Sequence, residues 1–266
     1  MTTTFAATDL AFLRDLLETR AGIVLEPGKE YLVETRIAPL LTANKLSGLP
    51  ELVRKIRIDA QLQKKVIEAF TTNETSFFRD LAPFQSLRAT IFPALQAKPD
   101  RVRIWSAASS TGQEAYSVAM MLRDEFPSLA ARAEIVGTDL NEVVVAKARS
   151  GRYTQAEVSR GLPAASLVKH FTRKGLEWEV SEPIRAMTQF RQQNLLEHWP
   201  AAPPFDLILL RNVLIYFSLD TRARLLRRMR DAMRKDGWLM LGSSETSAPP
   251  ESFTPSAGTV GLFRPK

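Results

Sequence analysis

The sequence has no cysteine and contains only two histidines, His170 and His198. Without cysteine there is no disulfide framework and no thiolate zinc site, a composition typical of proteins in a reducing cytoplasm. Two isolated histidines are too few for a histidine metal cluster, so we expect no bound metal. Residues 1–9 lack the basic and apolar regions of a signal peptide, and no apolar run reaches membrane-spanning length. We therefore expect a cytoplasmic protein with no membrane insertion.

Charge is unevenly distributed over the 266 residues, whose formal net charge is +7. Residues 1–80 carry eleven basic and eleven acidic side chains, so the whole excess lies beyond them. Residues 220–235 hold seven Lys or Arg side chains against Asp220 and Asp231. The apolar periodicity of this stretch predicts a helix with four arginines directed outward: Arg224, Arg227, Arg228 and Arg234. Such a surface indicates an acidic protein partner or nucleic acid, or it is simply a solvated helix face.

Residues 1–72 are predicted to form a small all-helical domain. Leu10, Leu13 and Leu17 recur at helical spacing, and further apolar groups with the same period follow them. Residues 73–90 are interpreted as a connector, and residues 91–266 as the larger domain. A chain of this length can bury a hydrophobic core in both domains.

Strand-like and helix-like segments alternate beyond residue 101. The predicted helices are 115–126, 142–149 and 219–234, and the predicted strands are 102–107, 134–139, 188–194, 205–211, 238–242 and 260–263. This alternation favours an α/β fold with a mostly parallel, doubly wound sheet and helices on both faces. An insertion at about 151–186 breaks the pattern and is predicted to contain a hairpin with its turn near Lys174 and Gly175.

A strand, a tight loop and a helix follow one another at residues 105–114, which read WSAASSTGQE. In doubly wound sheets, a unit of this kind brings the backbone against an adenosine-type cofactor. The loop is not a P-loop, because it lacks Gly-Lys-Ser/Thr, and it has only one glycine. Asp139 ends the second predicted strand, where a carboxylate can accept both hydroxyls of a ribose. The alternatives are a merely structural turn, and a cap by Asp139 on the helix that begins near Asn141.

Four separated motifs carry a family resemblance. They are TNETSFFR at 72–79, WSAASSTGQE at 105–114, FDLILLRNVLIYF at 205–217 and LGSSE at 241–245. In this order they resemble the CheR-type chemoreceptor glutamate methyltransferases, and the similarity begins at GIVL in residues 22–25. The resemblance implies a Rossmann-like class I methyltransferase domain that converts S-adenosylmethionine to S-adenosylhomocysteine. It further implies methylation of glutamate side chains on the cytoplasmic domain of chemoreceptors in chemotaxis adaptation.

The same resemblance implies which residues contact the cofactor. Besides Asp139, they are Asn73, Thr75, Arg79, Glu114, Asn194, Leu195, Arg211 and Asn212. Arg79 is expected to form a bidentate pair with the methionine carboxylate. Without the resemblance, Glu114 would be interpreted as compensating a helix dipole and Arg79 as a surface charge.

The expected reaction needs few catalytic groups. A glutamate carboxylate is ionised near neutral pH because it titrates near ~4.3, so no general base is required to activate it. The protein must instead align the reactants and exclude water. Tyr216 is a candidate for positioning the acceptor, although a half-buried aromatic side chain at a strand end is an equally good interpretation.

Two features of the sequence concern where a receptor would dock. The second predicted N-terminal helix carries Pro39 where the family usually has arginines, and a proline there is expected to kink the helix, which puts receptor docking through it in doubt. The insertion at 151–186 is instead a candidate site for a receptor C-terminal tail.

Three rival functions remain open at this point. The basic half and the segment APPF at 202–205 resemble features of nucleic-acid methyltransferases, but Ala202 cannot accept a hydrogen bond from a target amine. A binding module without catalysis is disfavoured because Asp139 and the Thr111-Gly112 turn are intact. A signalling receptor outside chemotaxis is the third alternative.

Overall fold

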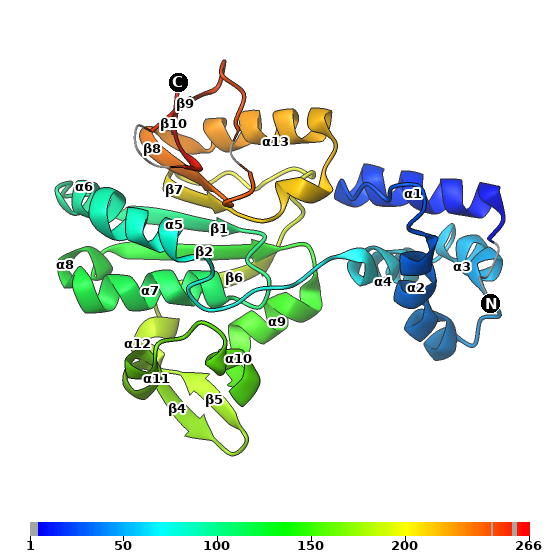
Figure 1. Cartoon of the computed structure of the whole chain (residues 1–266), viewed down its shortest axis with the longest axis horizontal. Coiled ribbons are helices and arrows are strands. Elements are labelled where there is room, and N and C mark those ends of the chain that lie inside the picture. The colour runs from blue at the N-terminus through cyan, green and yellow to red at the C-terminus, as the bar shows by residue number, and fades with distance from the viewer. Residues whose placement is uncertain (1–4, 246, 257–259) are drawn as a thin grey trace. The chain divides into compact units, whose positions relative to one another are not determined.

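The computed structural model describes residues 5–245, 247–256 and 260–266. The chain forms two compact units (Figure 1). We call residues 1–72 with 216–221 the helical unit, and residues 73–215 with 222–266 the sheet unit.

The helical unit confirms the predicted all-helical fold. Its helices bury the periodic apolar side chains; Leu13 and Leu17 of the first helix, for example, are fully buried. A left-handed glycine, Gly22 (φ 72°), ends that helix. The Asp59 side chain caps the fourth helix by accepting a hydrogen bond from the Leu62 amide (2.9 Å). The helices are α1 (Ala7–Ala21), α2 (Glu30–Asn44), α3 (Leu49–Ile56) and α4 (Ala60–Phe70).

Pro39 lies inside α2, and the helix continues beyond it to Asn44. Because proline has no amide hydrogen, the carbonyl one turn earlier loses its helical hydrogen bond. The residues that anchor α2 precede it: Val33 and Ile37 are buried, and the Arg36 guanidinium donates to the carbonyls of residues 69 and 71 (3.1 and 2.9 Å). Packing before the proline therefore holds the helix in place.

The sheet unit contains a seven-stranded sheet of order β6-β2-β1-β7-β8-β10-β9. The first five strands in this order are parallel, and β10 is antiparallel to both of its neighbours. The predicted mostly parallel, doubly wound sheet is confirmed. The strands are β1 (Val102–Ala107), β2 (Ala133–Asp139), β6 (Thr188–Gln192), β7 (Phe205–Leu210), β8 (Met233–Leu241), β9 (Phe253–Pro255) and β10 (Leu262–Pro265).

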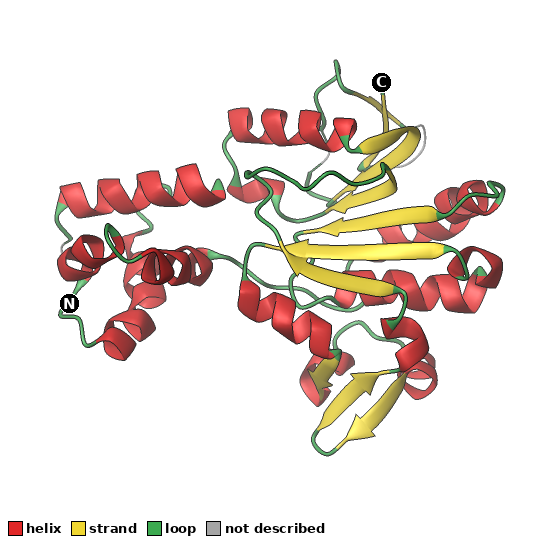
Figure 2. Cartoon of the chain, turned by 180° about the vertical axis from the view of Figure 1, so that it is seen from behind, coloured by secondary structure: helices red, strands yellow, loops and turns green. Residues whose placement is uncertain are grey.

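Side chains alternate between the two faces of this sheet. Ile104 of β1 and Phe190 of β6 face the main core, whereas Trp105 and Arg191 point to the opposite face. Helices α7 and α9 pack on β2 and β6 on the core side. The helices of this layered unit are α5 (Leu81–Ser86), η1 (Leu87–Ile91), α6 (Phe92–Gln96), α7 (Gln113–Glu125), α8 (Pro127–Ala130), α9 (Glu142–Ser150) and most of η2 (Leu214–Tyr216) and α13 (Leu219–Asp231) (Figures 1 and 2). Residues 216 and 219–221 of the last two belong to the helical unit.

The insertion forms a second, three-stranded antiparallel sheet of order β3-β5-β4. The predicted hairpin is confirmed, with Gly175 (φ 64°) in its turn. The third strand was missed, because three residues give too short a pattern to recognise. The elements of the insertion are β3 (Arg152–Thr154), α10 (Gln155–Ser159), α11 (Ala164–His170), β4 (Phe171–Lys174), β5 (Glu177–Val180) and α12 (Glu182–Arg185).

The predicted boundaries near the C-terminus were wrong. The helix expected to reach residue 234 ends at Asp231, and β8 begins at Met233 rather than at residue 238. The polar residues 234–236 continue the helical charge pattern, but pairing of Met233 with Phe205 of β7 draws them into the strand. The final strand is shifted to Leu262–Pro265, and β9 was not predicted.

Two of the four arginines expected to point outward are instead engaged. Arg228 donates to the Leu195 carbonyl (2.8 Å) and lies over the Trp199 ring, 4.1 Å from its centroid. Arg234, which lies in β8, pairs with Asp206 (3.2 Å). Arg224 and Arg227 are exposed. The basic surface is therefore smaller than the sequence pattern indicates.

Candidate functional site

The loop between β1 and α7 makes a tight turn at the carboxyl edge of the sheet. Ala108 (φ 59°), Ser110 (φ 49°) and Gly112 (φ 93°) all have left-handed backbone conformations. At Gly112 a Cβ atom would lie 2.9 Å from the Ala148 Cβ, so only glycine fits. Left-handed conformations at non-glycine residues cost free energy and are common at ligand sites. This turn is therefore held by its surroundings rather than by local preference.

Asp139, at the end of β2, joins two loops through its buried carboxylate. One oxygen accepts from the Ser110 amide (2.8 Å), and the other accepts from the Asn141 amide (3.0 Å). The cap of α9 is Asn141, whose side chain accepts from the Val143 amide (2.9 Å). The alternative interpretation of Asp139 as this helix cap is therefore wrong. A carboxylate oxygen has two lone pairs, so each oxygen of Asp139 can accept more than one hydrogen bond.

The segment after β6 lies beside Asp139. The Gln193 amide donates to the Asp139 carbonyl (2.8 Å), so the two residues that follow are close to the strand tip. Asn194 is half-buried and its side chain accepts from the Leu196 amide (2.9 Å), while Leu195 is buried. The structure thus brings Asn194 and Leu195 to the same edge as Asp139.

The connector lies against the tight loop. The Asn73 carbonyl accepts from the Ser110 hydroxyl (2.8 Å), and Phe77 is fully buried with its ring edge-on to Tyr153 (5.0 Å between centroids). Arg79 is half-buried, and its guanidinium donates to the carbonyl of Glu74 (2.8 Å). Thr75 is also half-buried in this segment. The connector is therefore anchored beside the loop by a buried aromatic side chain and a hydrogen bond.

Arg211 and Glu114, which are distant in sequence, form a largely buried ion pair. The Arg211 guanidinium donates to the Glu114 carboxylate (2.9 Å) and to the Arg79 carbonyl (2.7 Å), and it lies 3.2 Å from the Asp80 carboxylate. The other Glu114 oxygen accepts from the Ser106 hydroxyl (2.7 Å). Glu114 is thus more than a helix-dipole charge, because it joins β1, α7 and the connector.

Glu245 was missed as a site residue, although its motif was recognised. Its buried carboxylate accepts from the amides of Asn212 (2.7 Å), Gly242 (2.9 Å) and Ile215 (3.3 Å). Asn212 has a left-handed backbone (φ 59°) at this point. Glu245 therefore fixes the chain that follows β7. The sequence did offer a signal for Glu245: an acidic residue three positions after Gly242, the glycine that directly follows β8.

One buried tyrosine supports the loop, a second one joins α7 to α9, and neither was predicted. The Tyr153 hydroxyl donates to the Thr111 carbonyl (2.6 Å), and the Tyr116 hydroxyl donates to the Ala148 carbonyl (2.8 Å). Burial raises the pKa of Tyr116 to about 12 and the pKa of Tyr153 well above its ordinary value. Both hydroxyls remain protonated donors at neutral pH.

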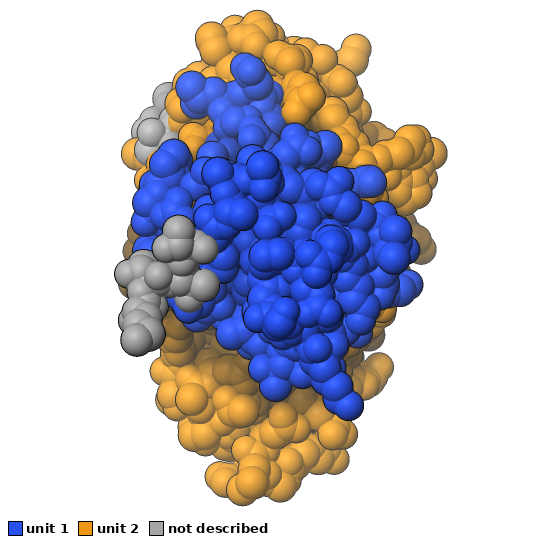
Figure 3. All heavy atoms as spheres, turned by 90° about the vertical axis from the view of Figure 1, so that its right-hand side faces the viewer, with its two compact units in different colours: residues 1–72, 216–221 blue, residues 73–215, 222–266 orange. Residues whose placement is uncertain are grey.

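Tyr216 ends η2 and is half-buried. Residues 216–221 belong to the helical unit, as Figure 3 shows by colour. The Tyr216 carbonyl accepts a hydrogen bond from the Val24 amide (3.0 Å). A role for Tyr216 in positioning the acceptor stays a prediction.

The described residues include neither a candidate metal site nor a membrane-spanning helix. They contain no group of three His, Cys, Asp or Glu side chains arranged to hold a metal ion. None of their helices is long and apolar enough to cross a bilayer.

The sequence matches a known family over most of its length. The family described as CheR methyltransferase, SAM binding domain matches residues 73–261, and the CheR methyltransferase all-alpha domain matches residues 8–71. The chain belongs to the CheR methyltransferase family. Its relatives include chemotaxis protein methyltransferase 1 of Pseudomonas aeruginosa, 39% identical over 90% of each chain. Chemotaxis protein methyltransferase Cher2 of Pseudomonas putida is 38% identical over 89% of this chain and 90% of its own.

S-adenosylmethionine is the cofactor of this CheR-family protein. The structure fits that group: the Asp139 carboxylate lies at a strand tip, where its oxygens can accept hydrogen bonds from hydroxyls, and the turn at Gly112 packs closely on Ala148 and so fixes the loop beside it. Parallel strands place ligands at this carboxyl edge. The individual contacts of the predicted residues stay predictions.

Arg79 provides a test of the connector. Arg79→Ala is expected to weaken S-adenosylhomocysteine binding tenfold or more, because a charge-assisted hydrogen bond contributes about 1.5–3 kcal/mol. Isothermal titration calorimetry measures this. Arg173→Ala is the matched control, since Arg173 is an exposed side chain of the hairpin and its guanidinium donates to the nearby Gly175 carbonyl. Equal affinities of the wild type and Arg79→Ala would show that Arg79 does not reach the cofactor.

Proposed function

We propose that this protein transfers a methyl group from S-adenosylmethionine to glutamate carboxylates of chemoreceptors, and so forms glutamyl methyl esters. The observation that carries the proposal is the buried Asp139 carboxylate bridging the tight loop and the start of α9 in a CheR-family chain. The names of the similar proteins, chemotaxis protein methyltransferases, support the receptor substrate.

Bound S-adenosylmethionine supplies an electrophilic methyl group on a sulfonium centre. In the proposal, Asp139 holds the ribose, while Asn194 and Leu195 bind the adenine. Asn73, Thr75 and Arg79 cover the cofactor, and Glu114, Arg211 and Asn212 complete its site. The glutamate acceptor arrives ionised, so the protein aligns it and excludes water without removing a proton. Tyr216 positions that acceptor.

The insertion is the proposed attachment site for a receptor C-terminal tail. It carries two exposed apolar side chains, Leu176 (88% exposed) and Val168 (83% exposed). Exposed apolar groups of this kind are available to a partner. Receptors of this type present their substrate glutamates in the cytoplasm, so the proposal also places this protein there.

The chemistry of the product tests the proposal. Incubation with methyl-labelled S-adenosylmethionine and chemoreceptor cytoplasmic fragments is expected to give protein-bound label that mild alkali releases as methanol. A glutamyl ester hydrolyses under these conditions, whereas N-methyl groups do not. Because glutamate titrates near ~4.3, the rate should stay nearly constant above about pH 6.

Other outcomes identify the rival functions. Label that resists alkali, or that appears only on added nucleic acid, contradicts esterification of glutamate. Alkali-labile label on a signalling receptor outside chemotaxis, with none on chemoreceptor fragments, would retain the reaction and change the substrate.

A further inference from the structure

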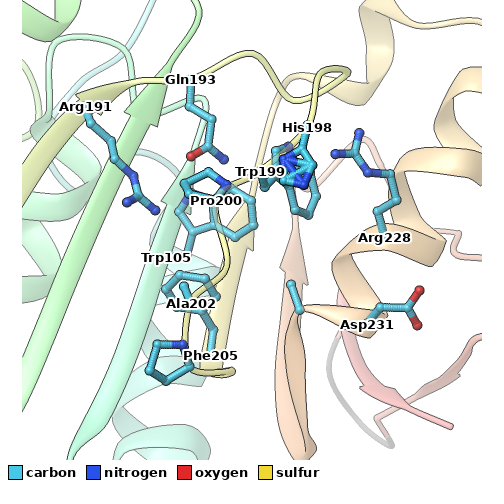
Figure 4. A pocket seen from close by; sticks show the side chains of 12 residues that line it. Trp105, Arg191, Gln193, His198, Trp199, Pro200, Ala202, Phe205, Arg228 and Asp231 are labelled. Carbon is cyan, nitrogen blue, oxygen red and sulfur yellow. The ribbon is translucent and has the colours of Figure 1, made fainter.

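A cavity of about 320 Å³ lies in the sheet unit, outside the residues assigned to the cofactor (Figure 4). Trp105, Trp199 and Phe205 supply aromatic walls, and α13 closes one side with Arg228 and Asp231. Its volume lies in the range of small-molecule sites, and its mixture of aromatic walls with a few polar groups is typical of them.

The cavity is on the sheet face opposite the main core. Trp105 and Arg191 point to this face, and the Trp105 indole donates to the Thr138 hydroxyl (2.9 Å) there. Figure 2 shows β1, β2 and β6 from this side, with no helix in front of them in the described chain. Residues 193–204, which connect β6 to β7, form a loop instead of a covering helix. Parallel sheets are normally covered by helices on both faces, whereas here Trp105 (1% exposed) is buried under the loop, with its ring centroid 4.9 Å from that of Trp199.

Polar atoms on the wall lack partners. Arg191 Nε, Gln193 Oε1 and Trp199 Nε1 are buried without a hydrogen bond within the described residues. In Figure 4 the Arg191 and Gln193 side chains lie on one side of the cavity, and Arg228 and Asp231 lie on the other. Buried polar atoms are nearly always hydrogen-bonded, so residues that line this cavity keep unused hydrogen-bonding capacity.

The charge balance of the cavity favours an anion. The Asp231 carboxylate is already paired with the Arg230 guanidinium (2.7 Å), whereas no carboxylate in the described chain pairs with Arg191. Arg228 adds a second positive charge over the Trp199 ring. A guanidinium without a counter-ion beside two indoles suits a ligand that combines an aromatic plane with a negative group.

We propose that this cavity binds a purine mononucleotide. The base would stack against the aromatic walls, the Gln193 amide would bond the edge of the base, and Arg191 would bind the phosphate. The Gln193 side chain can both donate and accept, so it suits either adenine or guanine. A purine nucleotide places a planar group and an anion together in a volume of this size, which a simple anion does not.

Binding of AMP and of GMP to the full chain, saturated with S-adenosylhomocysteine, tests the proposal. Saturation prevents the adenosine part of AMP from entering the cofactor site. Titration calorimetry and quenching of tryptophan fluorescence are expected to give, for at least one nucleotide, a dissociation constant of about 1 mM or tighter. Arg191→Ala and Gln193→Ala are each expected to weaken binding of that nucleotide tenfold or more.

Matched variants keep the result interpretable. Arg101→Ala removes an exposed arginine that does not line the cavity and should bind the nucleotide like the wild type. Unchanged S-adenosylhomocysteine affinity shows that each variant is folded. The proposal is overturned if neither nucleotide binds, if Arg191→Ala and Gln193→Ala bind like the wild type, or if inorganic phosphate binds as tightly as the nucleotide.

Discussion

Asp139→Ala is expected to weaken S-adenosylhomocysteine binding tenfold or more. The substitution removes the proposed acceptor of the ribose hydroxyls, and each charge-assisted hydrogen bond contributes about 1.5–3 kcal/mol. It also removes the acceptor for the Ser110 and Asn141 amides, so both loops lose a fixed contact. Calorimetric titration of the purified variant measures the change.

Asp236→Ala is the control for this experiment. Asp236 is an exposed carboxylate of the same unit, and its partner is Lys98. Exposed ion pairs contribute little, so this variant should bind S-adenosylhomocysteine like the wild type. If Asp139→Ala also keeps the wild-type affinity, Asp139 does not hold the ribose and the proposed cofactor placement is wrong.

Glu245→Ala is expected to lower the free energy of unfolding of the sheet unit by about 2–4 kcal/mol. Three backbone amides lose their acceptor, and a buried donor left without a partner costs about 1–3 kcal/mol. All four tryptophans of the chain lie between residues 105 and 238. Tryptophan fluorescence during urea unfolding therefore reports on the sheet unit.

Glu251→Ala is the matched variant for Glu245. Glu251 is exposed, and its carboxylate lies 4.0 Å from the Arg227 guanidinium. Its loss should change the free energy of unfolding by less than about 1 kcal/mol. Glu245→Ala should in addition weaken S-adenosylhomocysteine binding, because Asn212 is no longer held. A stability equal to that of Glu251→Ala would contradict the role assigned to Glu245.

Much of the fold could be read from local patterns. The strand predicted at 102–107 is β1, and the helix predicted at 142–149 is α9, which extends to Ser150. These elements follow from apolar alternation and helical spacing, which act over a few residues. The prediction failed where a short strand carries polar residues, as at 233–236, because pairing with β7 decides the conformation there.

For the candidate site too, some residues could be predicted from the sequence and others could not. Sequence alone singled out Asp139, because a carboxylate at the end of a second strand occupies the carboxyl edge of any doubly wound sheet. The resemblance singled out Glu114 and Arg211, but their pairing was not predicted. Glu245 and Tyr153 were missed as supports of the site, since their partners are distant in sequence.

The sequence by itself determined the fold class, the family and the strand tip that carries Asp139, because these depend on local periodicity and on motifs in a fixed order. Only the tertiary structure decided that Glu114 lies against Arg211 and that the loop over the opposite sheet face encloses a cavity beside Trp105. Such contacts depend on strand order and on the length of the connecting loops. They arise from the packing of distant segments, which no local pattern specifies.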